Sequence, residues 1–143
     1  MAEVPSPADM LSRVLVDLKF GTNPAEEGKW PIYVNREPNK PDDCITVFDT
    51  VGVIEPRLQF EKRRTEKFGI QIRIRAREPK QAKANEIRDG LDLDVKDNTI
   101  QYDGLSYTVH SVSRITGVVP LGIDPASGCD LFTINAQLTL SNQ

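Results

Sequence analysis

Basic side chains crowd one short segment of this 143-residue sequence, residues 57–80. The segment holds nine basic and three acidic residues, a net charge of +6, whereas the rest of the chain sums to −9. Guanidinium and ammonium groups at this density bind the phosphates of a polyanion or the acidic surface of another protein. A solvated face that binds nothing is the third interpretation of the same pattern.

Arginines recur at every second position near the end of this segment. Arg73, Arg75 and Arg77 alternate with aliphatic residues over 68–77, which predicts a strand with one aliphatic and one arginine face. Neighbouring arginines of such a row lie about 6.6 Å apart and repel each other unless acids or water surround them. We therefore propose a candidate interface of six residues: Lys62, Arg63, Arg64, Arg73, Arg75 and Arg77.

The rest of the sequence favours a protein partner for these residues over a nucleic acid. The chain as a whole is acidic, and few aromatic side chains stand among the basic ones to stack on bases. A basic face that contacts an acidic face of a neighbouring copy makes a head-to-tail contact, which closes into a ring when the rotation allows.

Residues that could support catalysis or metal binding are sparse. The single histidine, His110, is expected on the polar face of a strand, and a catalytic triad would require a nucleophile and an acid that the sequence does not place beside it. Cys44 and Cys129 lack the C-x-x-C spacing of zinc sites. The acidic stretch 92–98 lacks the glycine and the final glutamate of a calcium loop. We expect no enzymatic activity, no metal and no cofactor.

Two helices are predicted from capping signals and apolar spacing. The first starts at Ser6-Pro7, carries an apolar stripe that includes Leu11 and Leu15, and should end at Gly21. The second should open at Pro79 and break near Gly90.

Strands account for most of the remaining sequence. An Asp-Gly turn at 103–104 predicts a hairpin, and residues 52–67 are interpreted as a connection or hairpin arm that is mobile in the isolated chain. The expected strands are 30–34, 44–48, 68–77, 99–102, 105–114 and 132–140. This order, α-β-β-β-α-β-β-β, predicts one α+β domain over residues 1–143, with a mainly antiparallel sheet of about five or six strands and two helices on one face. No apolar run is long enough to predict a membrane span.

Three stretches make the sequence similar to a known family. Residues 30–50, which read WPIYVNREPNKPDDCITVFDT, resemble the minor capsid or tail terminator proteins of long-tailed bacteriophages. The similarity continues with QIRIRAR at 71–77 and FTINA at 132–136, and it covers roughly residues 8–140.

This resemblance implies a structural role in the virion, at the head–tail junction, after assembly in the host cytoplasm. Such proteins form a homohexameric ring on assembly with the tail tube protein and can be monomeric in isolation. They stop polymerisation of the tube and present a surface to the head connector or completion protein. DNA passes through the ring without specific binding. The alternatives to a tail terminator are a head-completion or connector ring protein and, as a third class, a nucleic-acid-binding module.

Overall fold

The computed structural model describes residues 6–50, 58–60, 63–77, 81–102 and 105–142. Two helices and eight strands lie within these residues. In chain order they are α1 Pro7–Asp17, β1 Ile32–Val34, β2 Cys44–Asp49, β3 Leu58–Phe60, β4 Arg63–Ala76, α2 Ala82–Leu93, β5 Lys96–Tyr102, β6 Leu105–Arg114, β7 Val119–Ile123 and β8 Asp130–Asn142.

The strands form one mixed sheet in the order β1-β2-β4-β8-β6-β5. β1 runs parallel to β2, and the other described pairs are antiparallel. β3 pairs with the start of β4, and β7 pairs with the start of β8. One sheet with two helices was predicted and is present, but the sheet is larger than expected. β3 and β7 are the additional strands, and neither shows the alternation that marks a half-buried strand.

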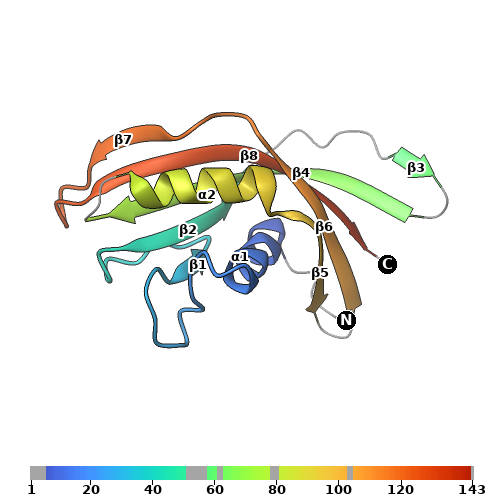
Figure 1. The fold of residues 1–143 in the computed structure, drawn as a ribbon, viewed down its shortest axis with the longest axis horizontal. Coiled ribbons are helices and arrows are strands. Elements are labelled where there is room, and N and C mark those ends of the chain that lie inside the picture. Colours follow the sequence, from blue (N-terminus) through green and yellow to red (C-terminus); the bar gives the residue numbers. More distant parts are fainter. Residues whose placement is uncertain (1–5, 51–57, 61–62, 78–80, 103–104, 143) are drawn as a thin grey trace.

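The sheet curves over α1 and α2, which lie on the same side of it (Figure 1). The apolar stripes of the two helices and the aliphatic sides of the central strands enclose a single core. Its fully buried large residues include Leu11, Leu15, Ile45, Ile72, Ile74, Ile87, Leu91, Ile134 and Leu138. Because each such side chain contributes about 1.5–3 kcal/mol when it leaves water, this layer is the main source of stability. None of the described helices is long and apolar enough to cross a membrane.

Both predicted helix ends near a glycine were wrong. α1 begins as expected, with the Ser6 hydroxyl accepting from the Asp9 amide at 3.1 Å, but it ends at Asp17, and Lys19 takes the left-handed conformation (φ 67°). Gly21 instead permits close approach, since a Cβ there would lie 2.5 Å from the carbonyl oxygen of Trp30. α2 starts at Ala82 and passes through Gly90 without a break. The predicted opening at Pro79 lies outside the described residues.

Residues 52–67 lie partly outside the described chain. Within them, Leu58–Phe60 and the first residues of β4 pair antiparallel. In Figure 1 this pair lies at the end of the sheet away from β7. Residues 63–76 of the basic segment are therefore part of the sheet itself, because they form β4 without interruption.

Candidate functional site: the arginine face and its covering loop

The predicted arginine face lies on the side of β4 opposite the helices. Ile72 and Ile74 are fully buried in the core, and register places Thr46 of β2 and Thr133 of β8 on either side of Arg73. Alternation along the strand puts Arg73, Arg75 and Arg77 together on the outer face, as predicted.

A loop of the same chain covers this row. Residues 35–43, between β1 and β2, pass across the end of β4, and their backbone holds the Arg75 guanidinium. Nε of Arg75 donates to the carbonyl oxygen of Asp42 at 3.0 Å, and Nη2 donates to that of Pro41 at 2.7 Å, next to the cis Lys40–Pro41 peptide bond. Only 4% of Arg75 is exposed. Its charge is thus buried among oxygens of its own chain.

Glu37 of the same loop lies between two of the arginines. Its Oε2 lies 3.2 Å from Nη1 of Arg73, and its Oε1 lies 4.0 Å from Nη1 of Arg75. The Arg73 guanidinium also lies over the ring of Phe48, 5.8 Å from its centroid, at the distance of a cation–π contact. One carboxylate therefore reduces the repulsion between neighbouring arginines of the row.

Arg77 is bound by the last residues of the loop. Its Nη2 lies 3.1 Å from Oδ2 of Asp42, and its backbone N–H donates to Oδ1 of Asp43 at 2.7 Å. Nη2 also reaches the carbonyl oxygen of Ser127, which precedes β8, at 3.5 Å. Arg77 still leaves 64% of its side chain exposed, so it is the arginine of the row that a partner can reach.

The acidic partners Glu37, Asp42 and Asp43 were not predicted as such. The available signal was strand register, because an antiparallel pair that places Cys44 opposite Arg75 must bring the residues just before Cys44 beside the end of β4. Whether Arg73, Arg75 and Arg77 also contact another subunit stays a prediction. Their observed contacts are within the chain.

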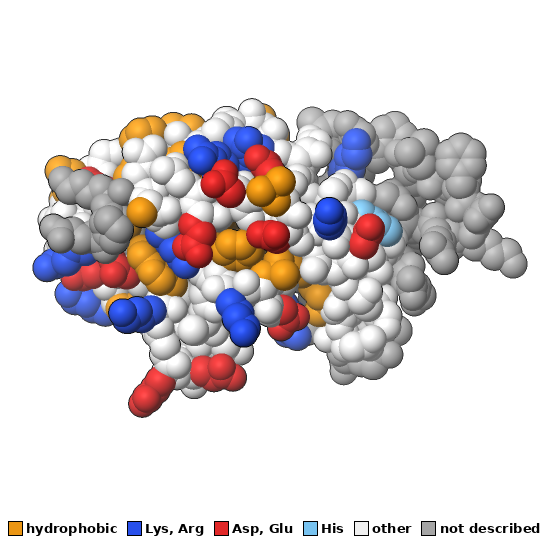
Figure 2. Space-filling view, viewed as in Figure 1, with side chains coloured by type: hydrophobic (Ala, Val, Ile, Leu, Met, Phe, Trp, Pro, Cys, Tyr) orange, Lys and Arg blue, Asp and Glu red, His pale blue; other side chains and the backbone are white. Residues whose placement is uncertain are grey.

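The other half of the candidate interface lies far from this row. Arg63 and Arg64 belong to the β3–β4 hairpin, and Lys62 lies outside the described residues. Nine residues of extended strand separate Arg64 from Arg73, a distance of about 30 Å at ~3.3 Å per residue. Arg63 and Arg64 therefore do not form one patch with the row of Arg73, Arg75 and Arg77. In the face that Figure 2 shows, basic and acidic side chains are interspersed rather than segregated.

Four buried polar atoms of this region have no hydrogen-bond partner among the residues that the structure describes: Oε1 of Glu37, Oγ1 of Thr46, Nε of Arg73 and Oγ1 of Thr133. Register places Thr46, Arg73 and Thr133 side by side across three strands. The layer between the loop and the sheet is therefore polar. Burial also raises the pKa of the nearby Cys44 thiol to about 11, although the charge of Arg75 partly opposes this.

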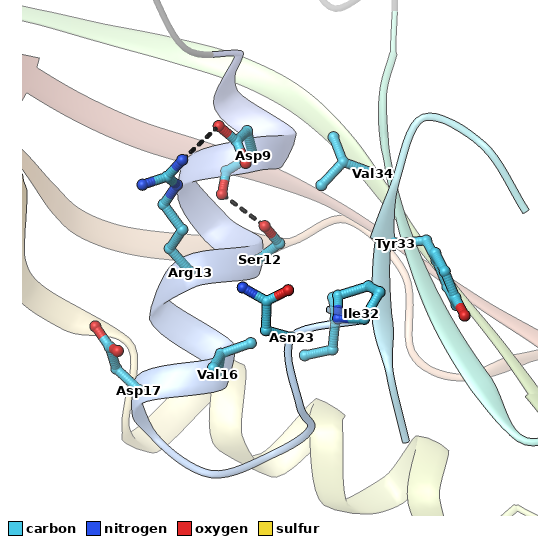
Figure 3. Close-up of a pocket in the computed structure, with 10 residues that line it drawn as sticks. Asp9, Ser12, Arg13, Val16, Asp17, Asn23, Ile32, Tyr33 and Val34 are labelled. Atoms are coloured by element: carbon cyan, nitrogen blue, oxygen red, sulfur yellow. Dashed lines mark hydrogen bonds and ion pairs between the residues drawn. The ribbon is translucent and has the colours of Figure 1, made fainter. Parts of the chain in front are cut away.

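A cleft of about 410 Å³ lies between α1 and β1. Figure 3 shows Ser12, Asn23, Ile32 and Val34 around this space, whereas Tyr33 points to the other side of its strand. The Ser12 hydroxyl donates to the carbonyl oxygen of Asp9 at 2.6 Å, so it is already engaged. No group of three or more metal-ligating side chains occurs in the part of the chain that the structure describes.

Comparison with known proteins gives a family. A family profile described as "Bacteriophage tail terminator protein" matches residues 14–142. A solved structure aligns over 93% of this chain and 90% of its own, with a TM-score of 0.50 and 14% sequence identity, which is a likeness of fold alone. No curated protein sequence matches the chain significantly. Because the profile spans nearly the whole chain, including the covering loop and the arginine strand, this protein belongs to the bacteriophage tail terminator family.

Proposed function

We propose that this chain caps the completed tail tube as a homohexameric ring, stops addition of tube protein and offers the surface to which the head attaches. The observation that carries this proposal is the family match over residues 14–142. The protein would act by binding at the head–tail junction, after folding in the host cytoplasm.

The chemistry of the arginine face supports a protein contact over a nucleic-acid contact. Binding to DNA phosphates requires free cationic groups, which displace the counterions condensed on the DNA. Arg75 is buried against backbone carbonyl groups, and Arg73 shares a carboxylate with it. The row therefore has little free positive charge for DNA. A ring through which DNA slides needs a bore that does not hold phosphates, and an acidic chain meets this need.

Within the proposed ring, the β3–β4 hairpin with Lys62, Arg63 and Arg64 contacts an acidic surface of the next subunit or of the tube. Arg77 is the exposed member of the strand row and would contribute from the other end of β4. Arg75 is a poor choice for testing the contact, because a carboxylate in its place would be buried beside Glu37.

Tail length is the readout of the proposed function. A phage that lacks this gene should make tails longer than normal when examined by electron microscopy, and the wild-type gene supplied in trans should restore their length. Tails of normal length beside unattached heads would contradict termination and favour the alternative, a head-completion or connector ring.

The contact itself can be tested with charge reversal. Arg63→Glu with Arg64→Glu should lower the fraction of hexamer seen by native mass spectrometry of the protein mixed with tail tubes, and should lengthen tails in the complementation assay. The matched control is Lys19→Glu with Lys29→Glu, which changes the net charge equally at two exposed lysines. Equal effects of the two double variants would mean that net charge, not the hairpin, controls assembly. Salt-sensitive retention of the wild-type protein on DNA would instead support the nucleic-acid-binding alternative.

A further inference from the structure

A serine, a histidine and an aspartate form a hydrogen-bonded chain across strands β8, β6 and β5. Nε2 of His110 lies 2.6 Å from the hydroxyl oxygen of Ser141, and Nδ1 of His110 lies 3.3 Å from Oδ1 of Asp97. The order of contacts, carboxylate to Nδ1 and Nε2 to hydroxyl, is that of a nucleophile activated by a base that an acid orients.

Three neighbouring strands bring these residues together. Thr108 of β6 pairs with Ser141 of β8, and the register then shifts between Val109 and Ser111, so His110 is the extra residue of a bulge. Bulges redirect side chains, and this one turns His110 toward β8. In β5, Asp97 takes the left-handed conformation (φ 51°) directly beside the bulge.

The pairing of Asp97 with His110 can be predicted from the sequence, but the position of Ser141 cannot. The Asp-Gly turn predicted at 103–104 implies a hairpin register in which residue 97 lies opposite residue 110, and the observed pairing of Tyr102 with Leu105 has this register. The position of Ser141 depends on the pairing of β6 with β8 and on the bulge. No local sequence pattern predicts either of these. The sequence alone placed neither an acid nor a nucleophile beside His110, whereas the structure places Asp97 and Ser141 there.

We propose that Asp97, His110 and Ser141 make Ser141 a nucleophile that accepts an acyl group from small, activated esters. With the Nδ1 proton held by Asp97, Nε2 of His110 is free to accept the proton of the Ser141 hydroxyl. The Ser141 oxygen forms a bond to the carbonyl carbon, and the bond from that carbon to the leaving alkoxide breaks. The proton passes from Nε2 to the leaving oxygen, so the products are acyl-Ser141 and the free alcohol.

Exposure limits the reagents that can react. Ser141 is 6% exposed, whereas the side chains of His110 and Asp97 are 35% and 80% exposed. Figure 2 shows the imidazole, in pale blue, at the surface. Because Ser141 is nearly buried and His110 beside it is partly exposed, the proposal is restricted to small acyl groups. The three residues account for one acylation of the serine, and the proposal is limited to that step.

The probe is p-nitrophenyl acetate, applied to the full chain at neutral pH and followed by intact mass and by peptide mapping. We expect one acetyl group on Ser141, formed faster than on any other residue. The matched control is Ser111, an exposed serine on the neighbouring strand, and Ser111→Ala should label like the wild type. Absence of acetyl-Ser141 in the folded wild type, or equal labelling of Ser111, would overturn the proposal.

Three variants separate activation from structure. His110→Gln should slow labelling of Ser141 about a hundredfold, the usual scale of general-base catalysis. Asp97→Asn preserves a residue that tolerates the left-handed conformation, so its melting temperature should stay near that of the wild type. Its labelling should nevertheless fall, because the amide no longer fixes the imidazole, and Asp97→Glu should restore part of the rate. Unchanged labelling in both His110→Gln and Asp97→Asn would show that the contacts serve only to join the strands.

Discussion

The Arg75 guanidinium donates a 2.7 Å hydrogen bond to the carbonyl oxygen of Pro41, which ties the central strand of the sheet to the loop that precedes β2. The loop has no regular structure of its own and lies against a face that alternation alone would leave to solvent. Its carbonyl groups and the Glu37 carboxylate fix its path, because they surround charges that otherwise repel each other. Arg73 and Arg75 thus hold the loop of residues 35–43 against the outer face of β4.

Arg75→Met removes this anchor while keeping most of the aliphatic stem. We expect a loss of about 2–4 kcal/mol in the free energy of unfolding, because two carbonyl groups and the Glu37 carboxylate lose a buried partner. Urea denaturation followed by circular dichroism measures this loss. Arg77→Met is the control and should cost less than about 1 kcal/mol, since that side chain is mostly exposed. Equal losses in the two variants would contradict an anchoring role for Arg75.

The strand that carries the arginine face could be predicted from the sequence, whereas the loop that covers it could not. The alternation around Ile72 and Ile74 defines β4 and its two faces, because a half-buried strand requires that period. The neutralisation of Arg75 depends on an irregular loop, and irregular segments carry no periodic signal. β7 lacks such a signal as well, since all five of its residues are exposed. Sequence reasoning therefore identified the arginine face but not what covers it.

Gly90 lies inside α2 because the Phe20 ring occupies the space of a side chain. A Cβ on Gly90 would lie 2.3 Å from the ring of Phe20, which is itself buried. Gly90→Ala should therefore destabilise the protein by about 1–3 kcal/mol, although alanine is the better helix former by about 1 kcal/mol. Thermal denaturation measures the change. In the background of Phe20→Leu, which removes the ring, Gly90→Ala should become neutral or stabilising, and persistence of the full penalty there would rule out the ring as its cause.

Cys44 should make stability fall at alkaline pH. Burial raises its pKa to about 11 in the folded protein, above its ordinary value of 9.0. The unfolded chain thus loses the thiol proton first, so this contribution to stability is complete below pH 9 and disappears as pH rises toward 11. The two-unit difference corresponds to at most about 3 kcal/mol. Unfolding free energies of the wild type and Cys44→Ala, measured from pH 8 to 11, should converge as pH rises.

The same burial predicts an unreactive thiol. In Cys129→Ser, which leaves Cys44 as the single thiol, a disulfide reagent at pH 8 should react slowly until denaturant is added, because the thiolate is the reacting form. Rapid reaction of the folded variant would show that Cys44 is accessible and that its pKa is not raised.

Leu121 and Ile123 expose large apolar side chains on β7, beside a further exposed residue, Val119. β7 is paired with β8 and is the outer strand at that end of the sheet. Exposed apolar side chains on an edge strand commonly mark a contact with another protein. If the proposed ring uses this strand, Leu121→Ser with Ile123→Ser should lower the hexamer fraction in native mass spectrometry while leaving the melting temperature of the monomer almost unchanged, because neither side chain contributes to the core. Leu93→Ser is the control, since it removes an apolar residue at least as exposed as these two from the end of α2. A fall in melting temperature without a change in assembly would show instead that β7 supports the fold rather than the ring.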